Sequence, residues 1–293
     1  MRIHFTGIAG AGMSAVALMM RSAGHEVSGS DEDVFPPMST YVEGLGFPFH
    51  RRFAAENLPP GLDLLVLGTS AKLGAEANPE VVAARAAGVR ITTFAELLGE
   101  TTAARDVTVV AGSFGKSTCC ALAAHILDQA GADPGWMVGA ISPSLPATGQ
   151  WGAGPMILEG DEYVVSTTDR RSKFALYAAD HLLLTSLIHD HVNVFPTFAQ
   201  YEAPFRELLR RLPEEGVAVL RDHPAIRMVA HETRARVVWY DAGPCEGWHA
   251  RDIVYGETTR FELVAPDGRT IRLATGLLGA HNVENIVGVA ALL

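Results

Sequence analysis

The sequence predicts an α/β protein in which two domains follow one another, each with a mostly parallel central sheet and covering helices. Short apolar segments alternate with helix-like segments along the chain, which is the βαβ pattern. Two glycine turns, at residues 7–12 and 112–115, each follow an apolar strand and open a helix. The length of 293 residues suits two domains, because domains commonly contain roughly 100 to 200 residues.

Composition narrows the possible functions. Hydrophobic residues make up 48% of the chain and charged residues 19%, as in an ordinary globular protein. The formal net charge is −10 and no run of lysine or arginine occurs, so we expect no nucleic-acid partner. Cys119, Cys120 and Cys245 fit no disulfide framework or zinc spacing. No signal peptide and no membrane-spanning stretch is visible, so we expect a cytoplasmic protein without a membrane partner.

A Rossmann-like first domain is expected over residues 1–100. Gly24 and Gly88 stand where helix C-caps are expected, each just before a strand. The polar stretch 99–105 is expected to link the domains. The expected elements, in chain order, are strand 3–5, helix 13–22, strand 25–28, strand 64–67, helix 79–87 and strand 89–92.

A second α/β domain is expected over residues 106–293. Its last segment, 283–293, has a helical apolar pattern that is still running at the final residue, which suggests that the protein continues. The expected elements are strand 107–111, helix 118–130, strands 156–158 and 181–186, helix 198–212, strands 217–220, 236–240, 261–264 and 270–274, and helix 283–293.

The second glycine turn predicts a phosphate-binding loop. Gly112-Ser113-Phe114-Gly115-Lys116-Ser117-Thr118 joins a strand to a helix start, where backbone N–H groups converge on an anion. Lys116 would meet the β and γ phosphates of ATP, and the Ser117 hydroxyl can bind Mg²⁺. The common eight-residue pattern would place its first glycine at Val110, so this loop is a variant. The alternative is a glycine turn with an incidental lysine.

The first glycine turn favours a nucleotide diphosphate. Gly7-Ile8-Ala9-Gly10-Ala11-Gly12-Met13 also follows a strand and opens a helix. Asp31, at the end of the next strand, would bind a ribose hydroxyl. The alternative is close packing of helix on strand, with Asp31 capping a turn.

Acidic residues after a strand predict a magnesium ligand. Glu159-Gly160-Asp161-Glu162 contains three carboxylates; Glu159 is our first choice of ligand and Glu162 the second. His189-Asp190-His191 follows another strand end and would reach the same metal. A solvated acidic turn and structural histidines are the alternatives.

Two further loops carry candidate ligand groups. Residues 169–174 bring three cations, Arg170, Arg171 and Lys173, into an otherwise acidic chain, and these can clamp a carboxylate or diphosphate. The alternative is a solvated basic turn. Residues 279–285 place side-chain amides at a helix start, where they either cap the helix or bind a purine edge.

Taken together, these segments resemble the Mur ligase family. Residues 112–118 are similar to the family's G-T-H-G-K-T-T, residues 7–14 to its G-I-x-G-x-G-M-S, and residues 279–285 to its G-x-H-N-x-x-N. Residues 159–163 and 169–174 are similar to the E-A-D-E-Y and D-x-R-S-K-F of the members that add a murein tripeptide in peptidoglycan recycling. The resemblance favours those members over the members that add L-alanine, which stay the alternative.

The resemblance implies an ATP-dependent, Mg²⁺-dependent ligase with UDP-N-acetylmuramate and a murein peptide as substrates. ATP would phosphorylate the muramyl carboxylate, and the peptide amine would displace phosphate to leave an amide. The implied catalytic residues are Lys116, Glu159 and His191, with Ser117, Glu159 and His191 around the metal. The implied ATP-binding residues are Gly112, Ser113, Phe114, Gly115, Lys116, Ser117, Thr118, His281, Asn282 and Asn285. The implied residues for the UDP-sugar are Gly7, Ala9, Gly10, Gly12, Met13, Ser14, Asp31, Thr69, Ser70, Arg170, Arg171 and Lys173.

The chain also departs from the family pattern. Phe114 replaces the loop histidine, Ser117 replaces a threonine, and the family's N-x-E-x-D-H segment has Ser186 and Ile188 in its first and third places. The family has a third, C-terminal domain that brings the second substrate, and the sequence ends just after residues 279–285. We therefore expect this chain alone to bind nucleotides and to be inactive as a ligase.

Two other hypotheses follow from these departures and from the first turn. One is a catalytically impaired nucleotide-binding relative. The other is a nicotinamide-dependent dehydrogenase, which rests on residues 7–12 alone and leaves Lys116 unexplained.

Overall fold

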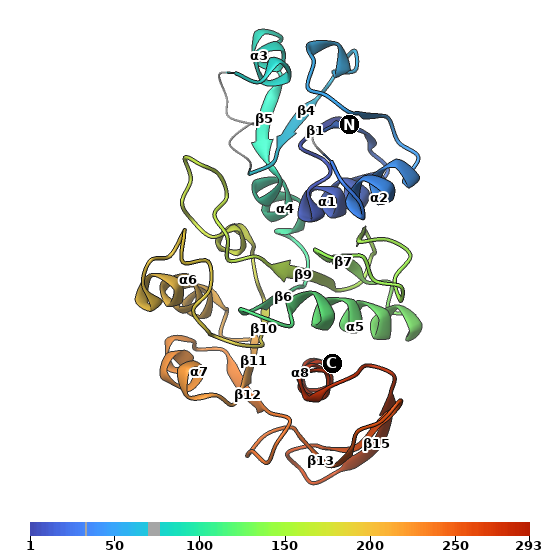
Figure 1. The fold of residues 1–293 in the computed structure, drawn as a ribbon. Helices are drawn as coiled ribbons and strands as arrows, with labels where there is room; N and C mark the ends of the chain where they lie inside the picture. The colour runs from blue at the N-terminus through green and yellow to red at the C-terminus, as the bar shows by residue number, and fades with distance from the viewer. Residues whose placement is uncertain (33, 70–76) are drawn as a thin grey trace. The chain divides into compact units, whose positions relative to one another are not determined.

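The computed structural model describes residues 1–32, 34–69 and 77–293, and these form two compact units (Figure 1). The first unit takes Met1–Arg105, Ala132–Met156 and Tyr163–Ala178; the second takes Asp106–Gly131, Ile157–Glu162 and Ala179–Leu293. The units interleave along the chain, whereas the expected domains, 1–100 and 106–293, are continuous. Those domain ranges stay a prediction.

The first unit contains a five-stranded parallel sheet in the order β3-β2-β1-β4-β5. Ile3 of β1 pairs with Val27 of β2 and Leu64 of β4, and all three side chains are buried, as expected for a parallel sheet covered on both faces. Its elements are β1 Arg2–Thr6, α1 Ala11–Ser22, β2 Glu26–Ser30, α2 Met38–Gly44, β3 Phe49–His50, η1 Ala55–Asn57, β4 Leu64–Leu67, α3 Pro79–Ala86, β5 Arg90–Thr93, α4 Phe94–Thr102, β7 Gly135–Met137, β8 Gly149–Gln150 and η3 Lys173–Leu176.

Several elements of the first unit were not expected, among them α4 and the strands β7 and β8. Helix α4 occupies the first part of the supposed linker 99–105, because Thr93 and Glu96 form a capping box and the helix buries Phe94, Leu97 and Leu98. The short antiparallel hairpin of β7 and β8 was not expected, since strands of three and two residues carry no readable periodicity.

The second unit contains strands in the order β12-β11-β10-β6-β9, of which β12, β11, β10 and β6 pair in parallel. The carboxyl ends of β6, β9 and β10 lead into Gly112, Asp161 and Thr185, so the segments that follow these strands meet at one edge of the sheet. The elements are β6 Val107–Ala111, α5 Lys116–Gln129, β9 Met156–Gly160, β10 His181–Leu184, α6 Phe198–Arg211, β11 Val217–Arg221, α7 Pro224–Val229, η4 Ala230–Glu232, β12 Arg236–Tyr240, β13 His249–Val254, β14 Thr259–Val264, β15 Thr270–Thr275 and α8 Ala280–Leu292.

The last part of the second unit is an antiparallel sheet, β13-β14-β15, followed by α8. Helix α8 lies beside α5 (Figure 1). The expected α/β class with mostly parallel sheets is confirmed. Among the described residues, no helix combines the length and apolar character that crossing a membrane would require.

Candidate functional site

The turn between β6 and α5 has a shape that two glycines make possible. Gly112 has φ of 138° and Gly115 has φ of 84°, both in the region that favours glycine. A Cβ atom at Gly112 would lie 2.3 Å from Thr185 Oγ1, and one at Gly115 would lie 2.6 Å from Asn285 Oδ1. The loop can therefore hold this shape only without side chains at these positions.

Residues after β10 and on α6 fix the loop. Ser113 Oγ accepts hydrogen bonds from the Ile188 N–H at 2.8 Å and from the Tyr201 hydroxyl at 2.9 Å. The Phe114 N–H donates to Ser186 Oγ at 2.9 Å. Gly115, the N-cap of α5, has no side chain to cap the helix, so the N–H groups of the first turn remain for an anion.

Lys116 points into the loop, with a side chain that is only 15% exposed. Its Nζ donates to the Gly112 carbonyl at 2.6 Å and lies 3.0 Å from Glu162 Oε2. Burial raises the pKa of the Glu162 carboxyl, while the Lys116 charge lowers it. The Gly112 carbonyl and the Glu162 carboxylate therefore hold the Lys116 ammonium beside the loop. A bound phosphate would compete with these two groups for the ammonium.

The carboxylates after β9 meet two different partners. Ser117 Oγ donates to Glu159 Oε1 at 2.9 Å, so two of the expected metal ligands lie together. His191, the third, has Nε2 3.2 Å from Glu162 Oε1. One ligand atom each of Glu162, Asp190 and His191 lies within 4.8 Å of the others.

These groups fit a divalent cation such as Mg²⁺. Carboxylate and hydroxyl oxygens are the donors that Mg²⁺ prefers. Glu162 Oε2 is buried and accepts no hydrogen bond within the described chain, although the Lys116 ammonium lies close to it. His191 has φ of 52°, an uncommon conformation for a residue other than glycine.

A cavity of about 470 Å³ extends from the loop to the start of α8. Phe114, 58% exposed, lines it with Ile188, 45% exposed. The expected purine ligands His281 and Asn285 also line it, whereas Asn282 is not among its lining residues and its side-chain N–H donates to the Leu278 carbonyl at 2.8 Å. The cavity therefore brings together two of the three expected purine residues.

An ion pair that sequence reasoning missed lies in the same wall. Arg221 Nη2 is 2.6 Å from Glu284 Oε2. Burial raises the pKa of Glu284 to about 7 despite the Arg221 charge. The acidic segments that follow the expected strands already pointed to Glu162 and Asp190 in the sequence. Nothing in the sequence pointed to Tyr201 and Arg221, because their contacts depend on how α6 and the end of β11 pack.

The first glycine turn is closed by hydrogen bonds of its own. Gly7 has φ of 90° and its N–H donates to the Ser30 carbonyl at 2.8 Å. Asp31 Oδ2 accepts the Ala9 N–H at 2.8 Å, and burial raises the pKa of this carboxyl although that hydrogen bond lowers it. Asp31 thus lies at the turn, and its contact is with the backbone.

Several other residues expected near the UDP-sugar lie in or beside helix α1, and some of them are buried. Met13 and Ser14 are buried in α1, while Gly10 begins that helix as its N-cap. A Cβ at Gly12 would touch the Phe94 ring at 3.4 Å, and the buried Lys173 ammonium lies 5.3 Å from the centre of the same ring.

The arginines of the basic loop are exposed, unlike Lys173. Arg171 pairs with Asp169 at 2.6 Å, so the three cations of the loop do not form one exposed cluster. Arg170 is exposed beside it. Thr69 donates to the Val165 carbonyl at 3.4 Å, and Ser70 lies outside the described residues.

The fold and this site define a phosphate-loop α/β protein with a Rossmann-like first unit. The models of the "Mur ligase family, catalytic domain" and of the "Mur ligase middle domain" match residues 2–106 and 110–293. The chain belongs to the Mur ligase family.

Individual relatives carry two different names. The UDP-N-acetylmuramate–L-alanyl-gamma-D-glutamyl-meso-2,6-diaminoheptandioate ligase of Escherichia coli is 30% identical over 99% of the chain, and the UDP-N-acetylmuramate–L-alanine ligase of Roseiflexus sp. is 34% identical over 100%. The chain spans 64% of the length of each. The crystal structure of UDP-N-acetylmuramate:L-alanyl-gamma-D-glutamyl-meso-diaminopimelate ligase from Neisseria meningitides aligns with a TM-score of 0.85 at 29% identity, covering 99% of this chain and 92% of that one.

Proposed function

We propose that the protein is a cytoplasmic, ATP-dependent ligase that joins the carboxylate of UDP-N-acetylmuramate to the amine of L-alanyl-γ-D-glutamyl-meso-diaminopimelate in peptidoglycan recycling. The observation that carries the proposal is the charged cluster at the loop of a Mur ligase chain, where Glu162 lies 3.0 Å from Lys116 Nζ and 3.2 Å from His191 Nε2. Charge of this kind suits phosphoryl transfer, which depends on positioning and electrostatic stabilisation.

The choice of the peptide rests on two segments. Residues 159–163 and 169–174 resemble those of the peptide-adding members, and the Escherichia coli relative carries such a name. The Roseiflexus relative, at comparable identity, is named for L-alanine. Addition of L-alanine is therefore the second candidate.

In the proposed reaction, a muramyl carboxylate oxygen attacks the γ phosphorus of ATP, and ADP leaves. The peptide amine attacks the resulting acyl phosphate, and the bond from the acyl carbon to the bridging oxygen breaks, so that this oxygen departs in phosphate. The loop N–H groups and Lys116 hold the phosphate oxygens and neutralise their charge. Bound Mg²⁺, held by Ser117, Glu159, Glu162, Asp190 and His191 or a subset of them, would offset the phosphate charge.

In this proposal the first unit binds the UDP group at the turn of Gly7, with Asp31 beside it. Phe114 and Ile188 replace a histidine and a carboxylate of the family pattern, and both side chains present apolar surface to the cavity. This observation motivates the competing proposal of a nucleotide-binding relative with impaired chemistry.

Two measurements test the proposal. Calorimetric titration of the chain should show binding of Mg-ATP and of UDP-N-acetylmuramate, and the absence of either would contradict it. In a version of the protein that includes the family's C-terminal domain, UDP-N-acetylmuramate labelled with ¹⁸O in its carboxylate should transfer one labelled oxygen to phosphate when ATP and tripeptide are added. Binding of both ligands without phosphate release would favour the impaired relative, and faster release with L-alanine would favour the second candidate.

A further inference from the structure

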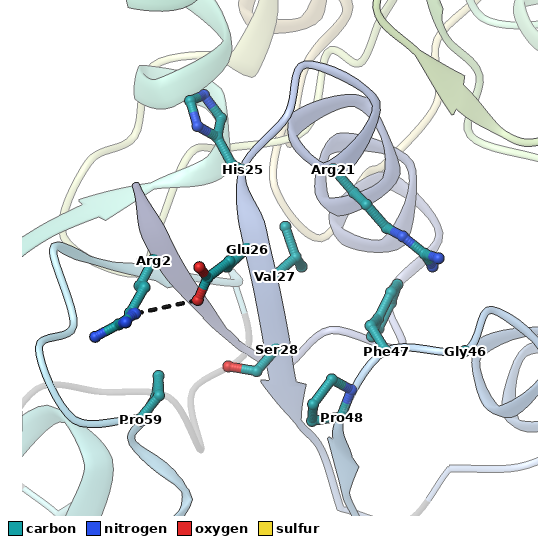
Figure 2. A pocket seen from close by; sticks show the side chains of 10 residues that line it. All are labelled: Arg2, Arg21, His25, Glu26, Val27, Ser28, Gly46, Phe47, Pro48 and Pro59. Carbon is teal, nitrogen blue, oxygen red and sulfur yellow. Dashed lines mark hydrogen bonds and ion pairs between the residues drawn. The ribbon is translucent and has the colours of Figure 1, made fainter.

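A second cavity, of about 360 Å³, lies in the first unit at the amino ends of β1 and β2 (Figure 2). Arg2 begins β1 and Glu26 begins β2, whereas Gly7 and Asp31 follow the other ends of these two parallel strands. A strand of five residues spans about 16 Å. The cavity is therefore at the opposite edge of the sheet from the first glycine turn, and the proposed ligase reaction does not use it.

The cavity has a largely apolar wall. Val27, Phe47, Pro48 and Pro59 line it, and the Pro48 carbonyl accepts the Gly29 N–H at 3.0 Å, which ties this wall to β2. Prolines fix the backbone, so little conformational entropy is lost when a ligand packs against them. A volume of this size suits a small organic molecule.

One cation at the cavity is held in place by uncharged groups. Arg21 donates to the Leu45 carbonyl, and its guanidinium carbon lies 5.9 Å from the centre of the Phe47 ring (Figure 2). Both of these contacts within the described chain are neutral, so the positive charge of Arg21 has no carboxylate partner there. A guanidinium close to a ring can bind a planar carboxylate through two parallel hydrogen bonds.

Two of the remaining charges at the cavity form an ion pair. Arg2 Nε lies 3.1 Å from Glu26 Oε2, and Arg2 Nη1 donates to the Pro60 carbonyl at 2.7 Å. Burial, followed by the charge of the amino terminus, lowers the pKa of His25, which keeps that ring neutral near pH 7. Arg2 and Glu26 offset one another, so the remaining positive charges near the cavity are Arg21 and the amino terminus beside His25, in a chain whose net charge is −10. The Glu26 carboxylate disfavours a dianion such as phosphate.

We propose that this cavity is a binding site for a small organic carboxylate with one apolar ring. The carboxylate would pair with Arg21, and the ring would pack against Phe47, Pro48 and Pro59. The residues of this site take no part in the proposed ligase reaction.

Benzoate is the test ligand, and the experiment compares three probes on the unaltered protein by calorimetric titration. We expect saturable benzoate binding, with benzamide and inorganic phosphate each weaker by at least about tenfold, because one lacks the charge and the other lacks the ring. Absence of saturable benzoate binding up to ~10 mM, or equal binding of either other probe, would overturn the proposal.

Variants then locate the site. Arg21→Gln should weaken benzoate binding by about tenfold or more, and the exposed Arg85→Gln on α3 should leave it unchanged. Phe47→Leu should also weaken it while keeping an apolar wall, which covers the case in which Arg21→Gln does not fold. Benzoate affinity that survives both cavity variants would place the ligand elsewhere and overturn the proposal, and a crystal soaked with benzoate should show its carboxylate on Arg21.

Discussion

The two glycine turns of this protein share a local architecture and differ in charge. Each follows a buried parallel strand, begins with a glycine at positive φ and leads into a helix. In the first turn the Ala9 N–H is already bonded to the Asp31 carboxylate, and no lysine or arginine stands within the turn. In the second, Lys116 lies against the loop and the helix start is uncapped. Similar glycine turns thus carry different neighbouring charges, and we propose that these charges separate the ligands of the two turns.

Removal of Lys116 should affect ligand binding at the second turn much more than at the first, and this is the largest effect that we expect. Lys116→Ala should weaken ATP binding by at least about 100-fold, because the triphosphate loses its cation in a partly buried site. Binding of UDP-N-acetylmuramate should not change, since we assign it to the first turn. Calorimetric titration of both ligands measures this, with the exposed Arg269→Ala as the control. An unchanged ATP affinity would remove our assignment of the phosphate loop.

Neutralising the carboxylates at the second turn should have the next largest effect. Glu159→Gln and Glu162→Gln should each lower the Mg²⁺-dependent part of ATP affinity by about tenfold, because an amide oxygen binds Mg²⁺ more weakly than a carboxylate oxygen. Titration of Mg²⁺ at fixed ATP measures the effect, and Glu215→Gln, an exposed acid of the same unit, is the control. The larger loss identifies the principal ligand; if neither variant changes the Mg²⁺ dependence, the metal lies elsewhere.

A smaller effect is expected at the first turn. Asp31→Asn keeps an acceptor for the Ala9 N–H but loses the charge that would bind a ribose hydroxyl. We expect about a fivefold loss of UDP-N-acetylmuramate affinity with no loss of ATP affinity. If ATP binding falls instead, the turns do not have the separate roles that we assign to them.

The smallest expected effect is on the melting temperature. Its pH dependence can be compared between a buried carboxyl of the second unit and one of the first. Glu284 has a pKa raised by burial from 4.5 to about 7, so the folded protein holds this proton more tightly than the unfolded chain. Its contribution is complete below pH 4.5 and is lost as the pH rises towards 7. The Tm of Glu284→Gln should therefore rise by several degrees relative to that of the unaltered protein between pH 5 and pH 8.

Asp31 provides the comparison in the first unit. Burial raises its pKa too, so Asp31→Asn should change the dependence of Tm on pH in the same direction. Melting curves followed by tryptophan fluorescence at several pH values measure both variants. A constant Tm difference across this range would show that Glu284 does not titrate there.

Features formed by residues close together in the sequence could be predicted from the sequence alone. Strand, glycine turn, lysine and helix follow one another in residues 107–129, so the loop and its Ser117 hydroxyl were predictable from spacing alone. Helix α4 was missed although the spacing of Thr93 and Glu96 is a capping-box signal in the sequence, because the polar residues Glu100 and Thr101 made the stretch 99–105 resemble a linker.

Features that depend on distant packing were not predictable. Tyr201 reaches Ser113 across 88 positions of sequence, and nothing in the sequence around either residue indicates the contact. Similarly, the preference of His191 for Glu162 depends on how the chain turns after β9 and β10. The order of residues named two acidic candidates, and the structure adds that Glu159 contacts Ser117 whereas Glu162 contacts His191.

The absence of a side chain at Gly115 has a consequence for the order of folding. Asn285 fills the space beside this glycine and contacts Cys119, which is 166 positions earlier in the chain. During synthesis the loop emerges from the ribosome long before its neighbour on α8. Because contacts so far apart in sequence close late, the cavity between the loop and α8 should be among the last parts of the second unit to form.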